Sequence, residues 1–510
     1  MGNYTNIMNR TLTHIPAKYT AAAILWWITM AAWAEEPLVA PATETATPAP
    51  SAPTDSVPDG TALAAGLEDQ LRDNLPPGGE YRDGRLIHTV QHGQSLGWLC
   101  QKYLYFTDYY TPDQLAQAIR EQNHLTGAWL SPGKEIIIPG LRTIPLTAQT
   151  VPQNKDFPAR GIYITMTSAA TQRVLSLVKQ MKPAGINTVV IDIKDMNGVV
   201  AYKSQVPLAQ KINASEHGPI RDLPKLINLL HAQDIHVVAR HVVFYDRQLA
   251  ENEPRLTLKS KSGAPWKQHG KQVWADPANT EVQDYNLALA AEVASMGIDE
   301  IQFDYIRFPA EGELADIAYS FDPQSTPKYE VLADFLKRAG ELLHPKGVLI
   351  SVDVYGVMAW SKQRDIDVTG QRLATLSHYV DVISPMLYPS HFYPPFEGHM
   401  YPAWEPYFFV YEGMIKTSRL VTEGGARIRP WLQAFHYRVK DHYHPDYVTT
   451  QILASHDIGV SDFLLWNAGN DYDVGLKGLE LWNQHEQLTG NEPVQTLSYI
   501  PSKQAAVPPN

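Results

Sequence analysis

The sequence predicts an α/β protein whose largest part is a (β/α)8 TIM barrel, and three observations predict it. From Arg160 onward, short β-rich runs alternate eight times with helical segments, which is the chain order of such a barrel. Glycines stand just before several of these runs, where helix C-caps belong, as at Gly185 and Gly347. No G-x-G-x-x-G follows the first run, so the rival open sheet with a dinucleotide site has no support.

The elements of this barrel can be placed along residues 158–485. Strands are expected at 161–166, 188–194, 235–241, 300–305, 348–355, 380–387, 428–435 and 462–466. Helices are expected between them, for example at 171–182, 222–233, 282–296, 329–343 and 448–456.

Composition excludes several classes of protein. The 510 residues are 44% hydrophobic, enough for a large core, and the formal net charge of -12 argues against a nucleic-acid partner, which needs a basic face. The lone Cys100 excludes a disulfide framework and any multi-cysteine metal site, and its apolar neighbours make it core material. The 18 histidines include no H-E-x-x-H pair, so we expect no metal and no cofactor.

The two ends of the chain differ from the barrel in composition. Arg10 and Lys18 precede the apolar run 21–34, which ends in a small-x-small Ala-Trp-Ala, so residues 1–34 are predicted to be a signal peptide. Export to the periplasm, cell envelope or medium follows, and membrane contact is expected only if this segment stays uncleaved. Residues 35–80 are rich in Pro, Ala and Thr and are predicted to be a linker, and residues 486–510 a flexible tail.

A small module is predicted at residues 86–140, with the order strand, helix, helix, strand. The stretches HTVQHGQSL, residues 119–123 and LSPGKEIIIP resemble a LysM domain. Gln94 stands where that family usually carries Asp, and residues 101–111 lengthen the connection between the helices. The resemblance implies binding to N-acetylglucosamine-containing glycans such as peptidoglycan or chitin. The alternative is a small packing domain without a ligand.

Function in a barrel is placed at the carboxyl ends of its strands. Period-2 alternation puts Asp192 with Lys194 on one face of the second strand, and Gln302 with Asp304 on one face of the fourth. Charges at this inner face are costly without a task or a partner. The residues expected to bind substrate are Asp192, Lys194, Arg240, His241, Gln302, Arg307, Tyr355, Tyr388, Gln433 and Trp466.

Two carboxylates from neighbouring strands indicate acid/base and nucleophile chemistry on an acetal, as in glycoside hydrolysis. We expect Asp304 to be the nucleophile or stabilising carboxylate and Asp353 the general acid/base. Asp192 is expected to bind a sugar hydroxyl or to act as the alternate acid. The alternative is structural, with Asp192–Lys194 and Asp304–Arg307 as ion pairs that lock the rim.

Six motifs extend this prediction: GIYITMTSA, VVIDIKDMNG, FDYIRFP, SVDVYG, ISPMLYPSHF and RPWLQAF. Together they resemble an uncharacterised glycoside hydrolase family with an amylase-like or α-galactosidase-like barrel, over residues 158–485. The resemblance implies a carboxylate at the end of strand four, which Asp304 matches. In related retaining clans the acid comes from strand five or six, and strand six offers none here, which favours Asp353.

The sequence therefore predicts an exported, carbohydrate-active enzyme that hydrolyses O-glycosyl bonds. Its expected partner is a polysaccharide or peptidoglycan glycan, near which the LysM-like module would hold it. The alternative is a catalytically silent, lectin-like barrel that binds glycan in the same cleft and is anchored at the cell wall.

Overall fold

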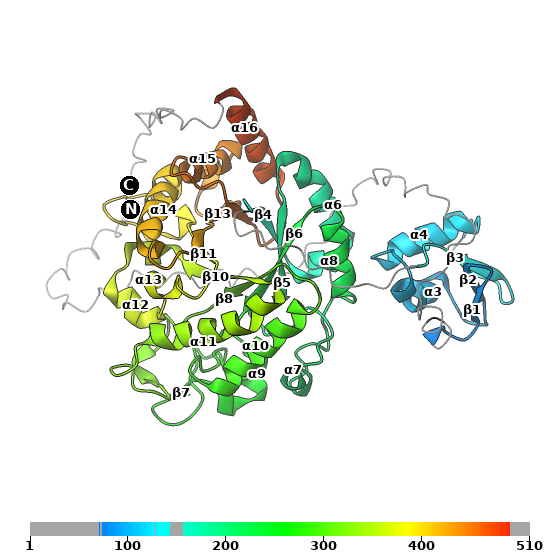
Figure 1. Ribbon diagram of the computed structural model, residues 1–510, viewed down its shortest axis with the longest axis horizontal. Helices are drawn as coiled ribbons and strands as arrows, with labels where there is room; N and C mark the ends of the chain where they lie inside the picture. Colours follow the sequence, from blue (N-terminus) through cyan, green and yellow to red (C-terminus); the bar gives the residue numbers. More distant parts are fainter. Residues whose placement is uncertain (1–70, 72–73, 128, 143–156, 490–510) are drawn as a thin grey trace, which may run out of the picture.

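The computed structural model describes residues 71, 74–127, 129–142 and 157–489 (Figure 1). The expected signal peptide, residues 35–70 of the expected linker and residues 490–510 of the expected tail lie outside this part of the chain. No helix within the described ranges is long and apolar enough to cross a membrane.

Eight parallel strands form a closed barrel, so the predicted (β/α)8 fold is confirmed. Each strand pairs with the next and the last pairs with the first. In chain order they are β4 (Arg160–Ile164), β5 (Thr188–Lys194), β6 (His236–Val242), β8 (Glu300–Asp304), β10 (Leu349–Tyr355), β11 (Val382–Met386), β13 (Trp431–Gln433) and β14 (Phe463–Trp466).

The seventh strand of the barrel differs from the expectation, because the sequence predicts a continuous strand at 428–435 and the structure has two short strands. A two-residue strand, β12 (Arg427–Ile428), pairs with β11 before β13 does. Pro430 lies between β12 and β13 and has no N–H to donate to a ladder, which explains the interruption.

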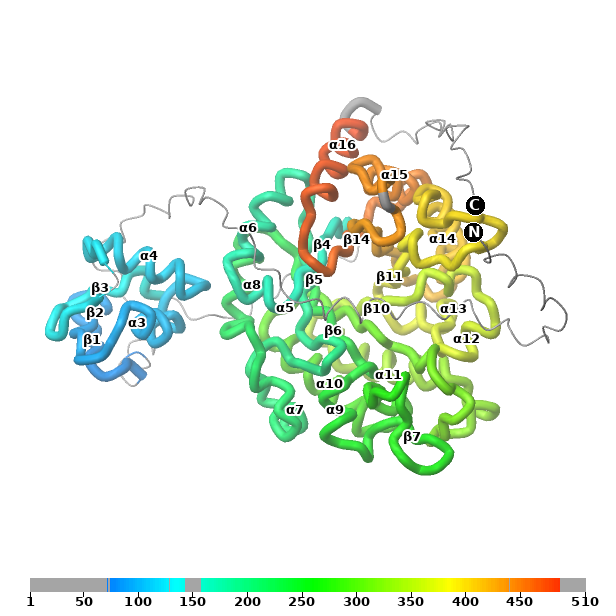
Figure 2. The backbone as a smooth tube through the Cα atoms, turned by 180° about the vertical axis from the view of Figure 1, so that it is seen from behind, coloured from blue at the N-terminus to red at the C-terminus, as the bar shows by residue number. Residues whose placement is uncertain are grey.

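Helices surround the barrel (Figures 1 and 2). The longer ones are α6 (Gln172–Met181), α8 (Leu223–His231), α10 (Thr280–Ala294), α11 (Lys328–Leu343), α14 (Pro406–Val421), α15 (Pro445–His456) and α16 (Asp473–Thr489). The five helices expected from the sequence are all present. α6 shows why: the Thr171 hydroxyl accepts a hydrogen bond from Arg173 N at its start, and Val174, Leu177, Val178 and Met181 form one buried stripe.

The connections carry shorter elements. These are α5 (Met166–Ala169), α7 (Pro207–Lys211), α9 (Arg247–Asn252), α12 (Gln363–Thr369), α13 (Leu373–Leu376), and the antiparallel pair β7 (Lys259–Ser260) and β9 (Ile317–Ala318). Gly185 and Gly347, with φ of 89° and 80°, follow short helical turns and lie a few residues before β5 and β10. Left-handed backbone is what the sequence predicts at these helix ends, and it favours glycine.

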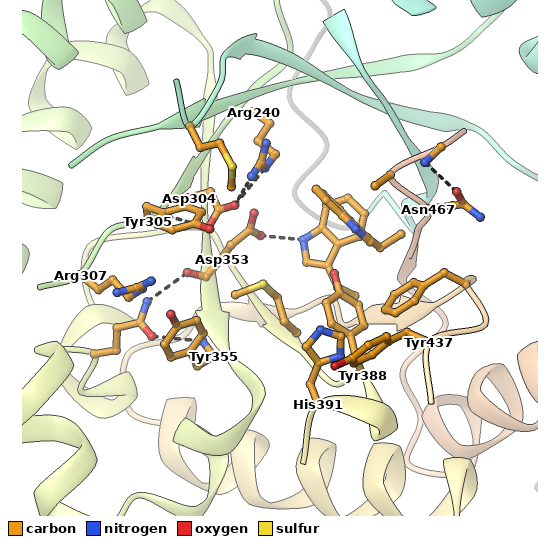
Figure 3. Close-up of a pocket in the computed structure, with 18 residues that line it drawn as sticks. Arg240, Asp304, Tyr305, Arg307, Asp353, Tyr355, Tyr388, His391, Tyr437 and Asn467 are labelled. Carbon is orange, nitrogen blue, oxygen red and sulfur yellow. Dashed lines mark hydrogen bonds and ion pairs between the residues drawn. The ribbon is translucent and has the colours of Figure 1, made fainter. Parts of the chain in front are cut away.

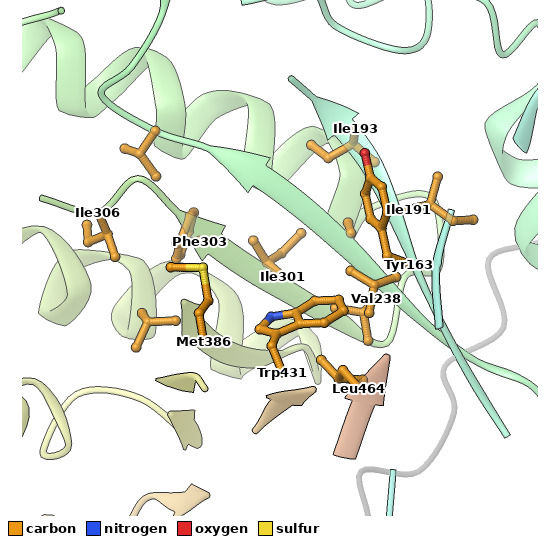
Figure 4. Packing of buried hydrophobic residues seen from close by; sticks show 14 of the residues in the cluster. Tyr163, Ile191, Ile193, Val238, Ile301, Phe303, Ile306, Met386, Trp431 and Leu464 are labelled. Carbon is orange, nitrogen blue, oxygen red and sulfur yellow. The ribbon is translucent and has the colours of Figure 1, made fainter. Parts of the chain in front are cut away.

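Apolar side chains fill the space between strands and helices (Figure 4). Phe303 of β8 contacts Phe335 of α11 with ring centroids 5.2 Å apart, so it faces the helix layer as the alternation predicts. Ile301 and Val238, also drawn in Figure 4, are fully buried. This packing fixes which residues of each strand point inward.

A buried ion pair lies at the amino-terminal end of the barrel. Arg429 binds both carboxylate oxygens of Glu300, and the Ser351 hydroxyl also donates to Glu300. His236 Nε2 lies 3.1 Å from Glu300 Oε2. Burial alone would raise the pKa of Glu300, but Arg429 and His236 outweigh it and hold that pKa below its usual value.

The amino-terminal module is a separate small fold. Its antiparallel sheet has the order β1 (Gly79–Arg82), β2 (Arg85–Thr89), β3 (Glu135–Ile138), and α3 (Leu96–Tyr103) and α4 (Pro112–Gln122) pack with it. From β2 onward the elements follow the expected order of strand, helix, helix, strand. Cys100 is 1% exposed in this core, where burial raises the pKa of its thiol to about 11, consistent with core material.

The module contacts the barrel beside α8. Lys225 Nζ donates to Leu104 O at 2.7 Å and to Tyr109 O at 2.9 Å. The Tyr110 hydroxyl donates to Ala169 O at 2.5 Å, and Tyr110 packs within the core of the barrel. Figure 2 shows the module on this side of the barrel.

Candidate active site

A pocket opens at the carboxyl ends of the barrel strands (Figure 3). Six strands contribute lining residues, and the loops after them supply most of the rest. From the strands come Arg240, Asp304, Asp353, Tyr355, Met386, Trp431 and Trp466. Aromatic walls around two carboxyl groups therefore characterise this pocket.

Strand register brings the two carboxyl groups together. Phe303 of β8 pairs with Val352 of β10, so the next residues along both strands, Asp304 and Asp353, are neighbours. Both side chains point into the pocket in Figure 3, and they are 5% and 1% exposed. The period-2 reading of the sequence predicts this orientation, while the chemical roles of the two residues stay a prediction.

Asp304 accepts three hydrogen bonds from N–H groups. Arg240 Nη2 and Nε donate to its Oδ2 at 2.5 and 3.0 Å. Tyr305 N donates to its Oδ1 at 2.6 Å, and Tyr305 has a left-handed φ of 50°. Non-glycine residues in this region are uncommon and occur often at functional sites. Charge-assisted and backbone contacts thus orient this carboxylate firmly.

Arg240 connects Asp304 to a second carboxylate, that of Asp192. Arg240 Nη1 donates to Asp192 Oδ1 at 2.5 Å, and the Tyr163 hydroxyl donates to Asp192 Oδ2 at the same distance. Burial raises the pKa of Asp192, although Arg240 and Tyr163 oppose that shift. Asp192 therefore lies behind Arg240 and holds it, outside the lining of the pocket.

Asp353 lies in a different environment. Its Oδ1 accepts one hydrogen bond, from Trp431 Nε1 at 2.7 Å. Burial and the adjacent charge of Asp304 raise the pKa of Asp353 well above its usual value, although Arg240 and Trp431 oppose this. Asp304 thus lies in an ion pair with Arg240, whereas the surroundings of Asp353 favour its protonated form, which is the form that a general acid needs.

Aromatic groups complete the pocket. Trp466 stacks on Tyr163 with ring centroids 4.0 Å apart, and the Arg240 guanidinium lies 5.1 Å from the Trp466 ring. Within the described residues, the Tyr388 hydroxyl and Trp466 Nε1 have no hydrogen-bond partner. Flat rings with polar edges suit the face and hydroxyl groups of a sugar.

Seven predicted site residues line this pocket: Arg240, Asp304, Arg307, Asp353, Tyr355, Tyr388 and Trp466. Gln302 and Gln433 do not. Gln302 Nε2 donates to Ser384 Oγ inside the barrel, at 3.3 Å. Gln433 accepts a hydrogen bond from Ser390 N and donates to Phe435 O, so it supports the loops that carry pocket residues.

Lys194 and His241 point away from the pocket, which corrects their expected placement. The register of β5 against β6 shifts between Asp192 and Lys194, a β-bulge that breaks the alternation on which the expectation for Lys194 depended. His241 follows Arg240 directly in β6, so alternation puts the two on opposite faces. Lys194 Nζ instead pairs with Asp246 Oδ2 at 2.7 Å, with both side chains fully buried. His241 lies 2.8 Å from Asn286 of α10, in the helix layer.

The expected structural ion pairs are also replaced. Asp192 pairs with Arg240 rather than with Lys194, and Asp304 pairs with Arg240 rather than with Arg307. A single arginine from β6 thus joins the acids of β5 and β8.

Sequence reasoning missed several pocket residues. Trp431 is the most important of them, because it hydrogen-bonds Asp353. It lies in the motif RPWLQAF, two residues before Gln433, so period-2 alternation could have placed it on the inner face. Loop residues such as Gln371 and Tyr437 had no comparable signal, since loops carry no periodicity.

No group of three His, Cys, Asp or Glu residues that could hold a metal ion occurs within the ranges the structure covers.

Two adjacent acids, one paired with an arginine and one whose pKa is raised, lie under aromatic walls at the carboxyl end of a (β/α)8 barrel. They meet the requirements for cleaving a glycosidic bond. The chain is accordingly a glycoside hydrolase. Residues 161–472 match the family model described as "Putative glycosyl hydrolase domain", and the chain belongs to that family.

Three solved structures to which the chain is similar are the following. A hypothetical protein from Ruminiclostridium thermocellum is 34% identical over 38% of this chain and 97% of its own, with a TM-score of 0.35. The glycoside hydrolase domain of PgaB (BpsB) from Bordetella bronchiseptica is 14% identical over 63% of this chain and 98% of its own, with a TM-score of 0.47. The spore cortex-lytic enzyme SleL from Bacillus megaterium is 13% identical over 83% and 96%, with a TM-score of 0.39. Among curated proteins none matches the chain.

Proposed function

We propose that this protein is an exported glycosidase that acts on cell-wall or other polysaccharide, with Asp304 and Asp353 as its catalytic pair. The observation that carries the proposal is the unequal environment of these two neighbouring acids. Asp304 accepts three N–H hydrogen bonds, whereas burial and the charge of Asp304 favour the protonated form of Asp353.

In the proposed reaction, Asp353 donates its proton to the glycosidic oxygen as the bond to the leaving sugar breaks. Asp304 attacks or stabilises the anomeric carbon as positive charge develops there. In the retaining form of this scheme, a covalent intermediate forms on Asp304, and water then hydrolyses it while Asp353 takes the proton of that water.

Arg240 has a positioning role in this scheme. It holds Asp304 through two hydrogen bonds and is itself held by Asp192, which the Tyr163 hydroxyl fixes in turn. A carboxylate fixed in this way needs little rearrangement when charge develops at the anomeric carbon.

The amino-terminal module is proposed to hold the enzyme at its substrate. The LysM resemblance of residues 86–140 supports binding to N-acetylglucosamine-containing glycan, and the apolar run at 21–34 supports export. The full chain carrying Asp304→Asn should sediment with insoluble peptidoglycan or chitin, and soluble N-acetylglucosamine oligomers should release it. Sedimentation unaffected by these oligomers would contradict the assignment of the module.

Turnover measurements on peptidoglycan, chitin, α-glucan and α-galactan oligosaccharides test the catalytic pair. Asp304→Asn is nearly isosteric, so it should lower kcat by about 10³-fold or more with little change in KM, because this carboxylate acts mainly in the transition state. Asp353→Asn should slow aryl glycosides less than natural oligosaccharides, since an aryl leaving group hardly needs a proton.

The matched control is Asp334→Asn, at an exposed carboxylate on α11. It should behave as wild type. If wild type, Asp304→Asn and Asp353→Asn all bind glycan without turnover, the lectin-like alternative replaces the enzyme. Loss of folding in Asp304→Asn alone would make this residue a structural partner of Arg240.

A further inference from the structure

Arg307 is a second arginine in the pocket, and its surroundings differ from those of Arg240. It lies three residues beyond Asp304, lines the pocket and is 7% exposed. Three aromatic rings surround its guanidinium, with centroids 4.9 Å away for Trp274, 4.9 Å for Tyr305 and 4.5 Å for Tyr355. Figure 3 shows Arg307 at the edge of the pocket, near Tyr305 and Tyr355.

Arg307 forms no ion pair with a carboxylate in the described part of the chain, although Asp304 and Glu311 lie near enough to act on the same tyrosine, Tyr355. Arg240 forms ion pairs with two acids, whereas Arg307 makes none within 4 Å and has one hydrogen bond, from Nη1 to Phe308 O at 3.1 Å. The acid nearest in the chain beyond it, Glu311, accepts from Gln268 and faces His269.

A guanidinium has five N–H donors along its edge, and aromatic rings cover its faces without satisfying that edge. Arg142 Nε and Arg429 Nε are buried and have no hydrogen-bond partner among the described residues. No nitrogen of Arg307 is both buried and without a partner. Its remaining donors are therefore accessible from the pocket that the residue lines.

A guanidinium fixed in this way matches a planar anion. Its fork of N–H groups binds a carboxylate through two parallel hydrogen bonds, and its aromatic neighbours hold it in position and exclude water. Because the local dielectric is low, the pairing is stronger than it would be at the surface. A neutral sugar would leave the Arg307 guanidinium without a carboxylate in direct contact.

We propose that Arg307 binds a carboxylate of the substrate, so that the enzyme acts on an acidic polysaccharide at a bond next to a carboxylated sugar. This inference rests on the proposed glycosidase function and specifies its substrate class. The carboxylate could belong to a uronic acid or to a lactyl ether on an amino sugar, and Arg307 recognises the chemistry that the two share.

The test compares matched polysaccharides with the full-length protein. A uronic-acid chain and a chain bearing lactyl ethers are each assayed before and after their carboxyl groups are reduced to alcohols. Wild type should prefer the carboxylated form by roughly 10- to 100-fold in kcat/KM, the range of a charge-assisted hydrogen-bonded contact. The chain type with the larger preference identifies the source of the carboxylate.

Arg307→Gln should abolish this preference, chiefly through KM for the carboxylated chain. Arg307→Lys keeps the positive charge but lacks the paired N–H donors of the guanidinium, so it should retain a smaller preference for the carboxylated chain. This variant tests the proposal even if Arg307→Gln does not fold. Arg419→Gln changes an exposed arginine of α14 that does not line the pocket and should keep the wild-type ratio.

Two results are distinguishable. If wild type hydrolyses reduced chains as well as carboxylated ones, or prefers sulfated chains, the assignment of Arg307 is wrong while the glycosidase remains. If no chain is hydrolysed, the proposed function fails, and equilibrium binding of the same chains still tests Arg307. Equal affinity for carboxylated and reduced chains would then overturn the assignment.

Discussion

At the scale of single residues, the protonation of Asp353 depends on its burial and on the groups around it, including Arg240, which opposes the rise of its pKa. Burial and the charge of Asp304 raise its pKa, and the N–H of Trp431, which donates to the ionised carboxylate, opposes them. A general acid must carry its proton, so activity should fall as pH rises through the pKa of Asp353. The fall of activity on the alkaline side of the pH profile therefore reflects the pKa of Asp353.

Trp431→Phe tests this relation. Removing the donor withdraws a contact that lowers the pKa of Asp353, so the alkaline limb of kcat/KM should move to higher pH. The measurement is the pH dependence of kcat/KM on an oligosaccharide that needs leaving-group protonation. Asp353→Asn should remove the alkaline limb of the profile. Trp129→Phe changes a side chain in the module that is 95% exposed, and it should leave the alkaline limb at its wild-type pH. A limb that moves to lower pH in Trp431→Phe would contradict the role of Asp353.

The sequence predicted the acids of the pocket better than their partners. Alternation along β8 and β10 placed Asp304 and Asp353 correctly because these strands are regular. The same reasoning failed at Lys194, because a β-bulge depends on how two strands pair and leaves no local periodic signal. Arg307 was predicted to reach the site, but only the structure shows that it pairs with rings rather than with Asp304.

At the scale of elements, the Lys194–Asp246 pair joins β5 to the segment after β6. The ammonium also donates to Val242 O at 2.8 Å and to Asn286 of α10 at 3.1 Å. Asp246 in turn caps α9, because its Oδ1 accepts a hydrogen bond from Leu249 N. The bulge in β5 thus serves the packing of the helix layer rather than the pocket.

Lys194→Met should lower the free energy of unfolding by about 3–5 kcal/mol, since it leaves the Asp246 carboxylate buried without its partner. The double variant with Asp246→Asn should be less destabilised than this single variant, because asparagine can still cap α9 and brings no charge. Urea denaturation of the four proteins in the cycle measures this. Strictly additive losses would show that the two side chains are not coupled.

Element positions were predictable where local signals agree. Apolar stripes and C-cap glycines placed five helices, and β-rich runs placed the strands to within a few residues. The division of the seventh strand into β12 and β13 was not predicted, although Pro430 supplies the physical reason. The amino-terminal strand β1 was missed because it is short and polar.

At the scale of the whole molecule, the barrel separates a stabilising ion pair at one end from the pocket at the other. Glu300 and Arg429 lie at the amino-terminal end, and the pKa of Glu300 is depressed in the folded protein. A depressed carboxyl pKa gives stability that is fully present above the unfolded-state pKa, near 4.5, and is lost as pH falls below it.

Glu300→Gln should therefore lower the free energy of unfolding at pH 7 by about 3–5 kcal/mol, because Arg429 is left buried without a counter-charge. The difference in the free energy of unfolding between wild type and Glu300→Gln should be constant from pH 7 to about 5 and should become smaller below pH 4.5. Denaturant titrations across this range measure it. A difference that grows as pH falls would contradict the assignment.

The module and the barrel are joined by a few buried polar contacts, so their coupling should depend on single side chains. Lys225 donates to two carbonyls of the module, Leu104 O and Tyr109 O, and burial lowers its pKa to about 8, so its ammonium is mostly present at pH 7.

Lys225→Met removes both hydrogen bonds and leaves the carbonyls without this donor. Backbone amides around Tyr109 and at the start of α8 should then exchange hydrogen faster, while amides of the barrel strands keep their protection. Lys179→Met, at an exposed lysine of α6, should change neither. Unchanged exchange around Tyr109 in Lys225→Met would show that other contacts hold the module in place.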